Sequence, residues 1–308
     1  MHLTKKALGL ITTIFAILLL SAGYYFSTEI VAFKVRSMEE DHTRSKIKDF
    51  KQIGLPEPET LRFQNGTISI QSWFFKNPKK KKCGVILLHG HTGTRWGILK
   101  YTPLFWKRGC SLFVYDARHH GESSGEFGTY GFYEKFDLDK GIEYFSEVSG
   151  IPEEKIGALG ESYGAATVLQ LSNVRKEVAF IIAESPYKDM RSIIEKRAVE
   201  LYGYPILVVS AVAFQIAELR ANFLVEDTSP LKAASQISAP VLLIHSKTDE
   251  FTPYEHSVEI LEAIPGKKKK LFITEWGAAH SKSINTNYKE VENSVDAFIK
   301  EFAPPEFK

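Results

Sequence analysis

Short, almost wholly apolar runs alternate with amphipathic stretches along most of the chain. Runs of this kind are typical of strands that are buried on both faces of a parallel sheet. They are GVILLHG (84–90), SLFVYD (111–116), KIGALG (155–160), VAFIIAES (178–185), PVLLIHS (240–246) and KKLFITE (269–275). The amphipathic stretches, which predict helices, cover residues 96–108, 132–148, 163–173, 254–264 and 286–302. This alternation predicts an α/β fold with a doubly wound sheet.

The segment before the first of these runs predicts a β-hairpin. It reads LRFQ-NG-TISIQSWFF (61–75), and Asn65-Gly66 tolerates the positive φ angles of a type I′ turn. With the hairpin, the chain holds about eight strands, so we expect a mostly parallel eight-stranded sheet. One large domain over residues 59–308 accommodates it.

One stretch, residues 187–235, interrupts the alternation of strand and helix. It contains two helical patterns, MRSIIEKRAVELY and PILVVSAVAFQIAELRANFLV, and no clear strand. The second pattern is apolar enough for a membrane contact, but it starts with proline and carries Gln215, Glu218 and Arg220. We therefore expect a helical cap over the strand ends, with an apolar lining for a substrate. The candidate lining residues are Tyr202, Tyr204, Phe214 and Phe223, which could equally only pack the cap onto the sheet.

The N-terminus is a different kind of segment. Residues 7–26 carry no charge, and 20 residues of helix span roughly 30 Å, the thickness of a bilayer's hydrocarbon layer. Lys5 and Lys6 favour a cytoplasmic N-terminus, which would place the rest of the chain outside the cytoplasm. A cleaved signal peptide is the alternative, because Ser21-Ala22-Gly23 offers small residues for cleavage. Both interpretations export the protein, either anchored in the membrane or secreted. A buried helix is the third alternative, and it alone would not export the protein.

These observations divide the chain into three parts. Residues 1–28 form the anchor or signal, and residues 29–58, which are charged and punctuated by proline, form a stalk or lead-in. The domain of residues 59–308 follows, with its cap at about 187–235.

Overall composition excludes several classes of protein. Of the 308 residues, 44% are hydrophobic and 25% are charged, which excludes a wholly disordered chain, collagen and a coiled coil. The 39 basic and 37 acidic residues give a net charge of +2, so nucleic acid is not an expected partner. His89, His91, His119 and His120 lack carboxylates or thiols at ligand spacing, so we expect no metal site.

The strongest chemical signal is the motif Gly160-Glu161-Ser162-Tyr163-Gly164. It follows an apolar strand directly and opens a helical stretch, which is the context of a nucleophile elbow. Such a turn exposes the Ser162 hydroxyl above the sheet. The helix N-terminus also places partly positive N–H groups beside a developing oxyanion.

A second loop, His89-Gly90-His91-Thr92-Gly93, follows the strand GVILLHG. Backbone N–H groups in such a loop can point at an oxyanion. We assign the two expected donors to the backbone N–H groups of His91 and Tyr163.

An acid and a base follow two later strands. Asp249, with Glu250 as its rival, comes just after PVLLIHS, where a carboxylate can orient a histidine. His280 lies in a loop of small residues after KKLFITE, and His256 is the nearest alternative base. An imidazole can accept and return a proton near neutral pH. Since the carboxyl ends of parallel strands share one edge, Ser162, Asp249 and His280 are expected to meet there.

From about residue 60 to 302 the chain resembles the α/β-hydrolase superfamily. It is particularly similar to bacterial serine hydrolases with a small helical cap, of esterase or serine-aminopeptidase type. The likeness lies in HGHTG (89–93), DARHHGESSG (116–125), GESYGAAT (160–167), PVLLIHSKTDEFTP (240–253) and GAAH (277–280). Ser246 departs from the family pattern, in which glycine usually follows the histidine; we expect it to tighten the acid loop without removing the acid.

The resemblance implies Ser162 as nucleophile, His280 as base, Asp249 as acid and no cofactor. It also implies hydrolysis of a small-molecule ester or thioester through an acyl-enzyme. A peptidase on the same fold is the first alternative, and a non-catalytic binding module is the second.

The two cysteines allow one further expectation. Cys83 and Cys110 precede two strands that are neighbours in the α/β-hydrolase sheet, so both thiols are expected at the sheet end away from the catalytic edge. An exported protein could join them in a disulfide. The alternative is two small buried hydrophobic residues.

Overall fold

The structure is a computed structural model that describes residues 5–79 and 81–308. Its centre is an eight-stranded sheet with the order β1-β2-β4-β3-β5-β6-β7-β8, and only β2 runs against the other strands. The strands are β1 (Glu59–Asn65), β2 (Ile68–Phe75), β3 (Gly84–Leu88), β4 (Ser111–Tyr115), β5 (Ile156–Glu161), β6 (Ile181–Glu184), β7 (Val241–Ser246) and β8 (Lys269–Thr274). The predicted mostly parallel, eight-stranded α/β sheet is confirmed.

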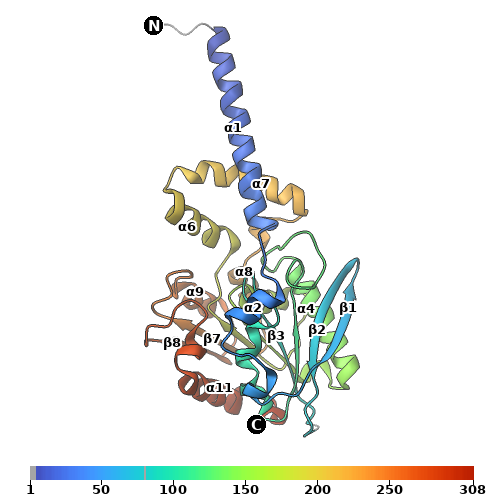
Figure 1. The fold of residues 1–308 in the computed structure, drawn as a ribbon. Coiled ribbons are helices and arrows are strands. Elements are labelled where there is room, and N and C mark those ends of the chain that lie inside the picture. The colour runs from blue at the N-terminus through green and yellow to red at the C-terminus, as the bar shows by residue number, and fades with distance from the viewer. Residues whose placement is uncertain (1–4, 80) are drawn as a thin grey trace.

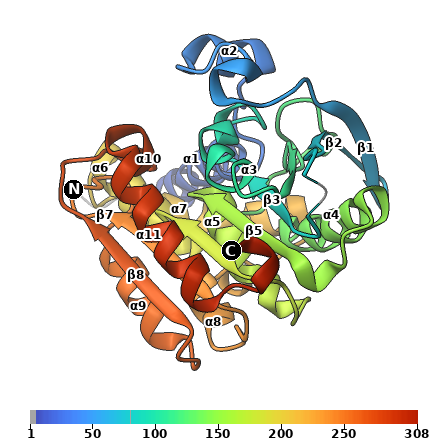
Figure 2. The same cartoon turned by 90° about the horizontal axis from the view of Figure 1, so that it is seen from below.

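Helices cover both faces of the sheet (Figure 2). Alternate strand residues divide between two cores, so Val85 and Leu87 of β3 face one core while Ile86 and Leu88 face the other. The first core is completed by α3 (Pro103–Trp106) and α11 (Tyr288–Phe302), and the second by α4 (Glu134–Ser149), α5 (Tyr163–Gln170), α8 (Pro230–Ala234) and α9 (Glu255–Ala263). Burial on both faces explains why the central strands are continuously apolar in sequence.

Two local expectations are wrong. In the hairpin, Asn65 pairs with Ile68, so the turn is Gly66-Thr67, and of these positions only Gly66 has a positive φ, at 59°. The single helix expected over residues 96–108 is two short pieces, a 3-10 turn at Gly97–Tyr101 and α3. Pro103 has no N–H to continue a helix, so a new one begins there instead.

The cap consists of α6 (Met190–Tyr202) and α7 (Ile206–Ala221), which lie above the carboxyl ends of the strands (Figure 1). Helix α1 (Lys5–Val31) covers all of the predicted apolar segment 7–26; residues 1–4 of the expected anchor lie outside the described residues. Figure 1 shows α1 crossing α7 and then projecting away from the domain. Among the described residues, α1 is long and apolar enough to cross a membrane. The segments Ile206–Ala221 and Val225–Ala234 are long and apolar enough only if they are taken together as one span, which is bent by 82°.

The segment between α1 and β1 lies against the domain and is not a free-standing stalk. It includes α2 (Met38–Arg44) and a 3-10 turn at Phe50–Ile53. Phe50 and Leu55 are buried in the core, and the buried Asp41 accepts hydrogen bonds from the backbone N–H and the hydroxyl of Thr94. The charged side chains of this segment therefore do not all face solvent.

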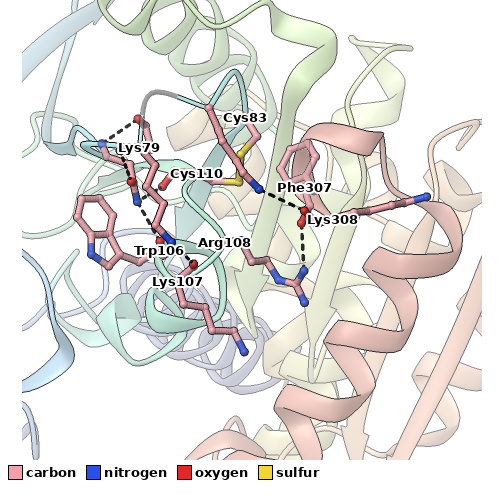
Figure 3. The surroundings of a disulfide bond; sticks show 11 residues. Lys79, Cys83, Trp106, Lys107, Arg108, Cys110, Phe307 and Lys308 are labelled. Atoms are coloured by element: carbon pink, nitrogen blue, oxygen red, sulfur yellow. Dashed lines mark hydrogen bonds between the residues drawn. A yellow bond between two sulfur atoms is a disulfide. The ribbon is translucent and has the colours of Figure 1, made fainter.

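Cys83 and Cys110 form a disulfide, with their Cα atoms 4.8 Å apart. The bond joins the starts of β3 and β4, and the backbone N–H of Ser111 also donates to the carbonyl of Cys83. Figure 3 shows the chain's C-terminus beside this bond, where Arg108 donates to the carbonyl oxygen of Phe307 at 3.0 Å. The disulfide thus fastens the sheet at the end opposite the cap.

Replacing both cysteines by alanine is expected to lower the free energy of unfolding. Closing a loop across a sequence separation of 27 residues restricts the unfolded chain, which is worth about 3–4 kcal/mol. Denaturant unfolding of the double variant and of the parent protein, with and without dithiothreitol, measures the difference. Reductant should destabilise the parent and leave the variant unchanged. Equal stability of the oxidised parent and the variant would contradict the expectation.

Candidate active site

Ser162 lies on a sharp turn between β5 and α5. Its backbone has φ 51° and ψ −110°, a conformation that residues other than glycine rarely adopt. The turn needs small neighbours, because a Cβ on Gly160 would lie 2.2 Å from the carbonyl oxygen of Gly164. A Cβ on Gly164 would lie 2.4 Å from the carbonyl oxygen of Leu88. The glycines of the motif therefore allow the close crossing that lifts Ser162 above the sheet.

Ser162, His280 and Asp249 form one hydrogen-bonded row. His280 Nε2 is 2.8 Å from Ser162 Oγ, and His280 Nδ1 is 2.7 Å from Asp249 Oδ2. With the proton on Nδ1, the ring donates to the carboxylate and accepts from the hydroxyl. The structure thus brings together three side chains that are far apart in the sequence, as expected.

Asp249 is held as a carboxylate. Burial alone would raise its pKa, but hydrogen bonds from His245, His280 and the backbone N–H of Thr252 outweigh that effect and keep the pKa below its ordinary value. The Thr252 hydroxyl lies 3.0 Å from Asp249 Oδ2 and 2.9 Å from His280 Nδ1. An ionised carboxylate can both orient the His280 ring and stabilise its positive charge.

Sequence reasoning missed Thr252 and His245 as partners of the acid. His245 is fully buried, with Nδ1 2.7 Å from Ser257 Oγ and Nε2 2.9 Å from the carbonyl oxygen of Thr252. Both ring nitrogens are therefore engaged away from Ser162. A histidine at the end of a wholly buried strand was the available signal for such a supporting role.

Ser246 links the two loops that carry Asp249 and His280. Its hydroxyl lies 2.6 Å from the carbonyl oxygen of Ala278, which is close to His280 in the chain. A glycine at this position could not make that bond.

The loop at residues 89–93 lies against Ser162. A Cβ on Gly90 would lie 3.6 Å from the Cβ of Ser162. The backbone N–H groups of His91 and Tyr163 donate to no other group in the part of the chain that the structure describes. Both N–H groups are therefore free to bind an oxygen atom of a ligand.

The segment after α1 holds this loop in place. The backbone N–H of Arg36 donates to the carbonyl of Thr92 at 3.0 Å, and the Arg36 guanidinium donates to the Thr92 hydroxyl at 2.7 Å. The Arg36 side chain also pairs with Asp41, 2.6 Å away. Residues that precede the expected domain thus fix the position of the loop next to Ser162.

Three of the four histidines singled out in the sequence, His91, His119 and His120, surround Phe33, and the ring of His89 lies 4.9 Å from that of His120. The ring of His91 lies 4.0 Å from that of Phe33, and His119 bonds to the Phe33 carbonyl at 2.9 Å. Burial, with a smaller contribution from Arg36, lowers the pKa of His91 to about 3, so its ring is neutral. In residues 5–79 and 81–308 no group of three or more His, Cys, Asp or Glu side chains could hold a metal ion.

An apolar cavity of about 240 Å³ lies over Ser162. His91, Tyr130, Tyr163 and Tyr187 line it together with Ser162, and the cap helix α6 forms one wall. Residues from α6 in that wall are Ile193, Ile194, Arg197, Ala198, Leu201 and Tyr202. The cavity can hold an apolar group next to the Ser162 hydroxyl.

Only one of the four expected lining residues, Tyr202, lines this cavity. Tyr204 is 77% exposed, beyond the Gly203 turn between α6 and α7. Phe214 is buried beneath the Arg191 guanidinium, and Phe223 packs against Phe132. These three side chains belong to the cap's own packing and surface.

Sequence reasoning also missed the wall that α1 contributes. Phe26, Glu29 and Ile30, from the last two turns of α1, line the cavity. The rings of Phe26 and Tyr202 lie 5.3 Å apart, so α1 and α6 meet at its rim. Glu29, a charge just beyond the uncharged run, was the one signal that α1 does not end as a simple anchor.

A wider, more polar cavity of about 720 Å³ lies on the His280 side. It is lined by Arg197, Glu200, Thr248, Glu250, Phe251, Gly277, Ala279 and His280. Arg197 and Phe251 also line the apolar cavity, so the two spaces adjoin on either side of the row. An apolar group and a polar group on one ligand could each find a matching space.

Comparison with known proteins agrees with this fold. Residues 101–304 match the prolyl oligopeptidase family. The uncharacterized protein YqkD of Bacillus subtilis is 32% identical over 217 residues, which is 70% of each chain. The uncharacterized membrane protein YNL320W of Saccharomyces cerevisiae is 23% identical over 242 residues, 77% of this chain and 78% of that protein.

Among solved structures, the Pyrococcus furiosus esterase Pf2001 superposes with a TM-score of 0.69. The match has 20% sequence identity and covers 87% of this chain and 99% of the esterase, so it supports the fold alone. The cap and the carboxyl ends of β4 to β8 fall within the residues matched to the family, whereas β1 to β3 and the loop at residues 89–93 precede them. The chain therefore belongs to the prolyl oligopeptidase family and is an α/β-hydrolase of the serine hydrolase type.

Proposed function

We propose that the protein hydrolyses carboxylic esters, thioesters included, with Ser162 as nucleophile, His280 as general base and Asp249 as the acid that orients His280. One observation carries this proposal: the Ser162 hydroxyl, the end of a hydrogen-bonded row, lies at the base of an apolar cavity. An apolar acyl group in that cavity would bring its carbonyl carbon to Ser162 Oγ.

The chemistry follows from the positions of the donors and acceptors. Ser162 Oγ attacks the carbonyl carbon while its proton moves to His280 Nε2, and the oxyanion accepts from the N–H groups of His91 and Tyr163. The carbon–oxygen bond to the alcohol then breaks, and the alcohol leaves with the proton from His280. Water attacks the acyl-enzyme, gives one proton to His280 and releases the carboxylic acid, and that proton returns to Ser162 Oγ. The polar cavity beside His280 suits the leaving group and the attacking water.

Peptide hydrolysis by the same residues is the second candidate. Membership of the prolyl oligopeptidase family favours it, because the chemical steps are the same for an amide. The small, apolar space above Ser162 favours an acyl chain over a peptide, and for that reason we rank the ester first.

We also propose that α1 anchors the protein with the domain outside the cytoplasm. Lys5 and Lys6 flank the apolar helix at its start, and the Cys83–Cys110 disulfide suits an oxidising compartment. The relative YNL320W is named a membrane protein. Gly23 packs on Val212 of α7, and an uncut anchor preserves this contact. The wall residues Phe26, Glu29 and Ile30 follow the cleavage site and remain in the chain in either case.

The test uses the full chain in detergent with p-nitrophenyl esters and aminoacyl p-nitroanilides, together with a fluorophosphonate probe. We expect faster turnover of the esters and a single probe adduct, located at Ser162 by mass spectrometry of the peptides. Faster turnover of the anilides would establish the peptidase instead. Folded protein that neither turns over any substrate nor takes up the probe would be a binding module.

A further inference from the structure

The free part of α1 is too short to cross a bilayer by itself. No residue of α1 before Gly23 is buried, and packing on the domain is established at Gly23, Ser27 and Ile30. The free, uncharged part, residues 7–22, is about 24 Å long. The hydrocarbon layer is about 30 Å thick, so the next turns of α1, which lie beside the cap, must complete the span.

Beside the cap, α1 crosses α7. A Cβ on Gly23 would lie 2.6 Å from Val212 Cγ1 and 3.3 Å from Ile216 Cδ1, so the two helices are in close contact there. Figure 1 shows α7 running across α1 rather than along it. If α1 spans a membrane, α7 therefore lies along the membrane surface.

The side chains of α7 suit that position. Val208, Val212 and Leu219 are spaced by four and seven residues, so they share one face of the helix. Contact with α1 covers Val212, but Val208 remains 61% exposed and Leu219 83% exposed, one on each side of the crossing. Exposed aliphatic side chains beside a membrane anchor indicate a surface that meets lipid.

Several tyrosine side chains lie near the crossing of α1 and α7. Tyr24 of α1 lies under the Arg220 guanidinium of α7, 4.7 Å from its ring centre. Tyr202 and Tyr204 are exposed at the turn between α6 and α7. Tyrosine rings prefer the boundary between hydrocarbon and water, which places this boundary at the cap.

The cavity over Ser162 has its rim at this boundary. Phe26 of α1 meets Tyr202 of α6 there, and Leu201 beside them is more than half exposed. We propose, building on the proposed function, that the substrate is a long-chain ester resident in the lipid bilayer, which reaches Ser162 between α1 and α6 while α7 lies in the membrane boundary. Its acyl chain would pass from lipid into the apolar cavity without crossing water.

Two esters with the same leaving group separate this proposal from the proposed function. The full chain in phosphatidylcholine vesicles is given p-nitrophenyl palmitate dissolved in the bilayer or p-nitrophenyl acetate dissolved in water. The double variant Val208→Asp/Leu219→Asp places two charges at the membrane face, outside both cavities. Tyr288→Asp on α11 is the matched control, because Tyr288 is exposed and lies one turn before Glu292, which pairs with Lys107 near the disulfide end of the sheet, opposite the cap.

We expect the double variant to hydrolyse the palmitate at least tenfold more slowly and the acetate at the parent rate, with no change in the control. Equal palmitate rates in variant and parent, or a parent that hydrolyses acetate but not palmitate, would overturn the inference and leave the proposed function intact. A parent inactive on both esters would overturn both.

A second measurement does not depend on activity. The chain has two cysteines, which are bonded to each other, so Leu219→Cys can be labelled uniquely with an environment-sensitive fluorophore. In vesicles that contain nitroxide-labelled lipid, its emission should be quenched strongly, and that of a label at Tyr288→Cys should not. Equal, weak quenching of the two labels would show that α7 does not meet the membrane.

Discussion

Replacing Ser162 by alanine is expected to lower kcat for ester hydrolysis by about 10⁶-fold, the scale seen when a serine nucleophile is removed. Alanine lacks the oxygen that forms the acyl-enzyme, and the N–H groups of His91 and Tyr163 could then assist only direct attack by water. The change removes one atom at a buried position and leaves Gly160 and Gly164, which shape the turn, untouched. Steady-state rates with p-nitrophenyl butyrate measure the loss.

The matched control is Ser235→Ala, at the exposed end of α8, which should retain the parent rate. Thermal unfolding of both variants checks that the loss does not come from misfolding. If the folded Ser162→Ala protein still formed a fluorophosphonate adduct and turned over ester, another residue would be the nucleophile.

The second large effect is expected at Asp249. Changing it to asparagine should lower kcat by about 10⁴-fold, because an amide favours the wrong imidazole tautomer. In the parent protein, His280 Nδ1 donates to Asp249 Oδ2 across 2.7 Å. An asparagine NH₂ in place of the carboxylate would donate to Nδ1, so the ring proton would move to Nε2. The Ser162 hydroxyl needs an acceptor at Nε2, and the protonated nitrogen could not accept its proton. Rates with the same ester, at a pH where the parent enzyme is fully active, measure the loss.

Glu250 provides the comparison, since the sequence offered it as the rival acid. Its side chain lines the polar cavity, and its backbone carbonyl accepts from Lys196 at 2.7 Å. Glu250→Gln should therefore lower kcat by less than about tenfold, which is small compared with the loss of kcat expected for a tautomer change. A larger loss at Glu250 than at Asp249 would assign the acid role to Glu250.

The parts of the fold that sequence predicts well are those in which one physical demand dominates. Central strands such as Gly84–Leu88 must be apolar on both faces, so their runs are unmistakable. The turn at Ser162 requires glycines at two fixed positions, and strand order brings Asp249 and His280 to the same edge. Local pattern and topology were sufficient for these features.

The parts that sequence predicts poorly depend on contacts between distant segments. Tyr204, Phe214 and Tyr202 are equally plausible lining residues until the arrangement of α6 and α7 is known, and only Tyr202 faces the cavity. Phe26 belongs to an apolar run that an anchor already explains, so its place in the wall of the cavity left no separate mark in the sequence. The turn at Gly66-Thr67 differs from the expected one by a single residue, which strand pairing decides.

The wall that α1 gives the cavity sets an order of events during translation. α1 leaves the ribosome first, whereas α7, on which it packs at Gly23, and the loop of His280 are made much later. The nascent chain therefore has no complete cavity until nearly all of it has been synthesised. A chain truncated before the cap would lack the residues of α6 and α7 that share a core with Ile30.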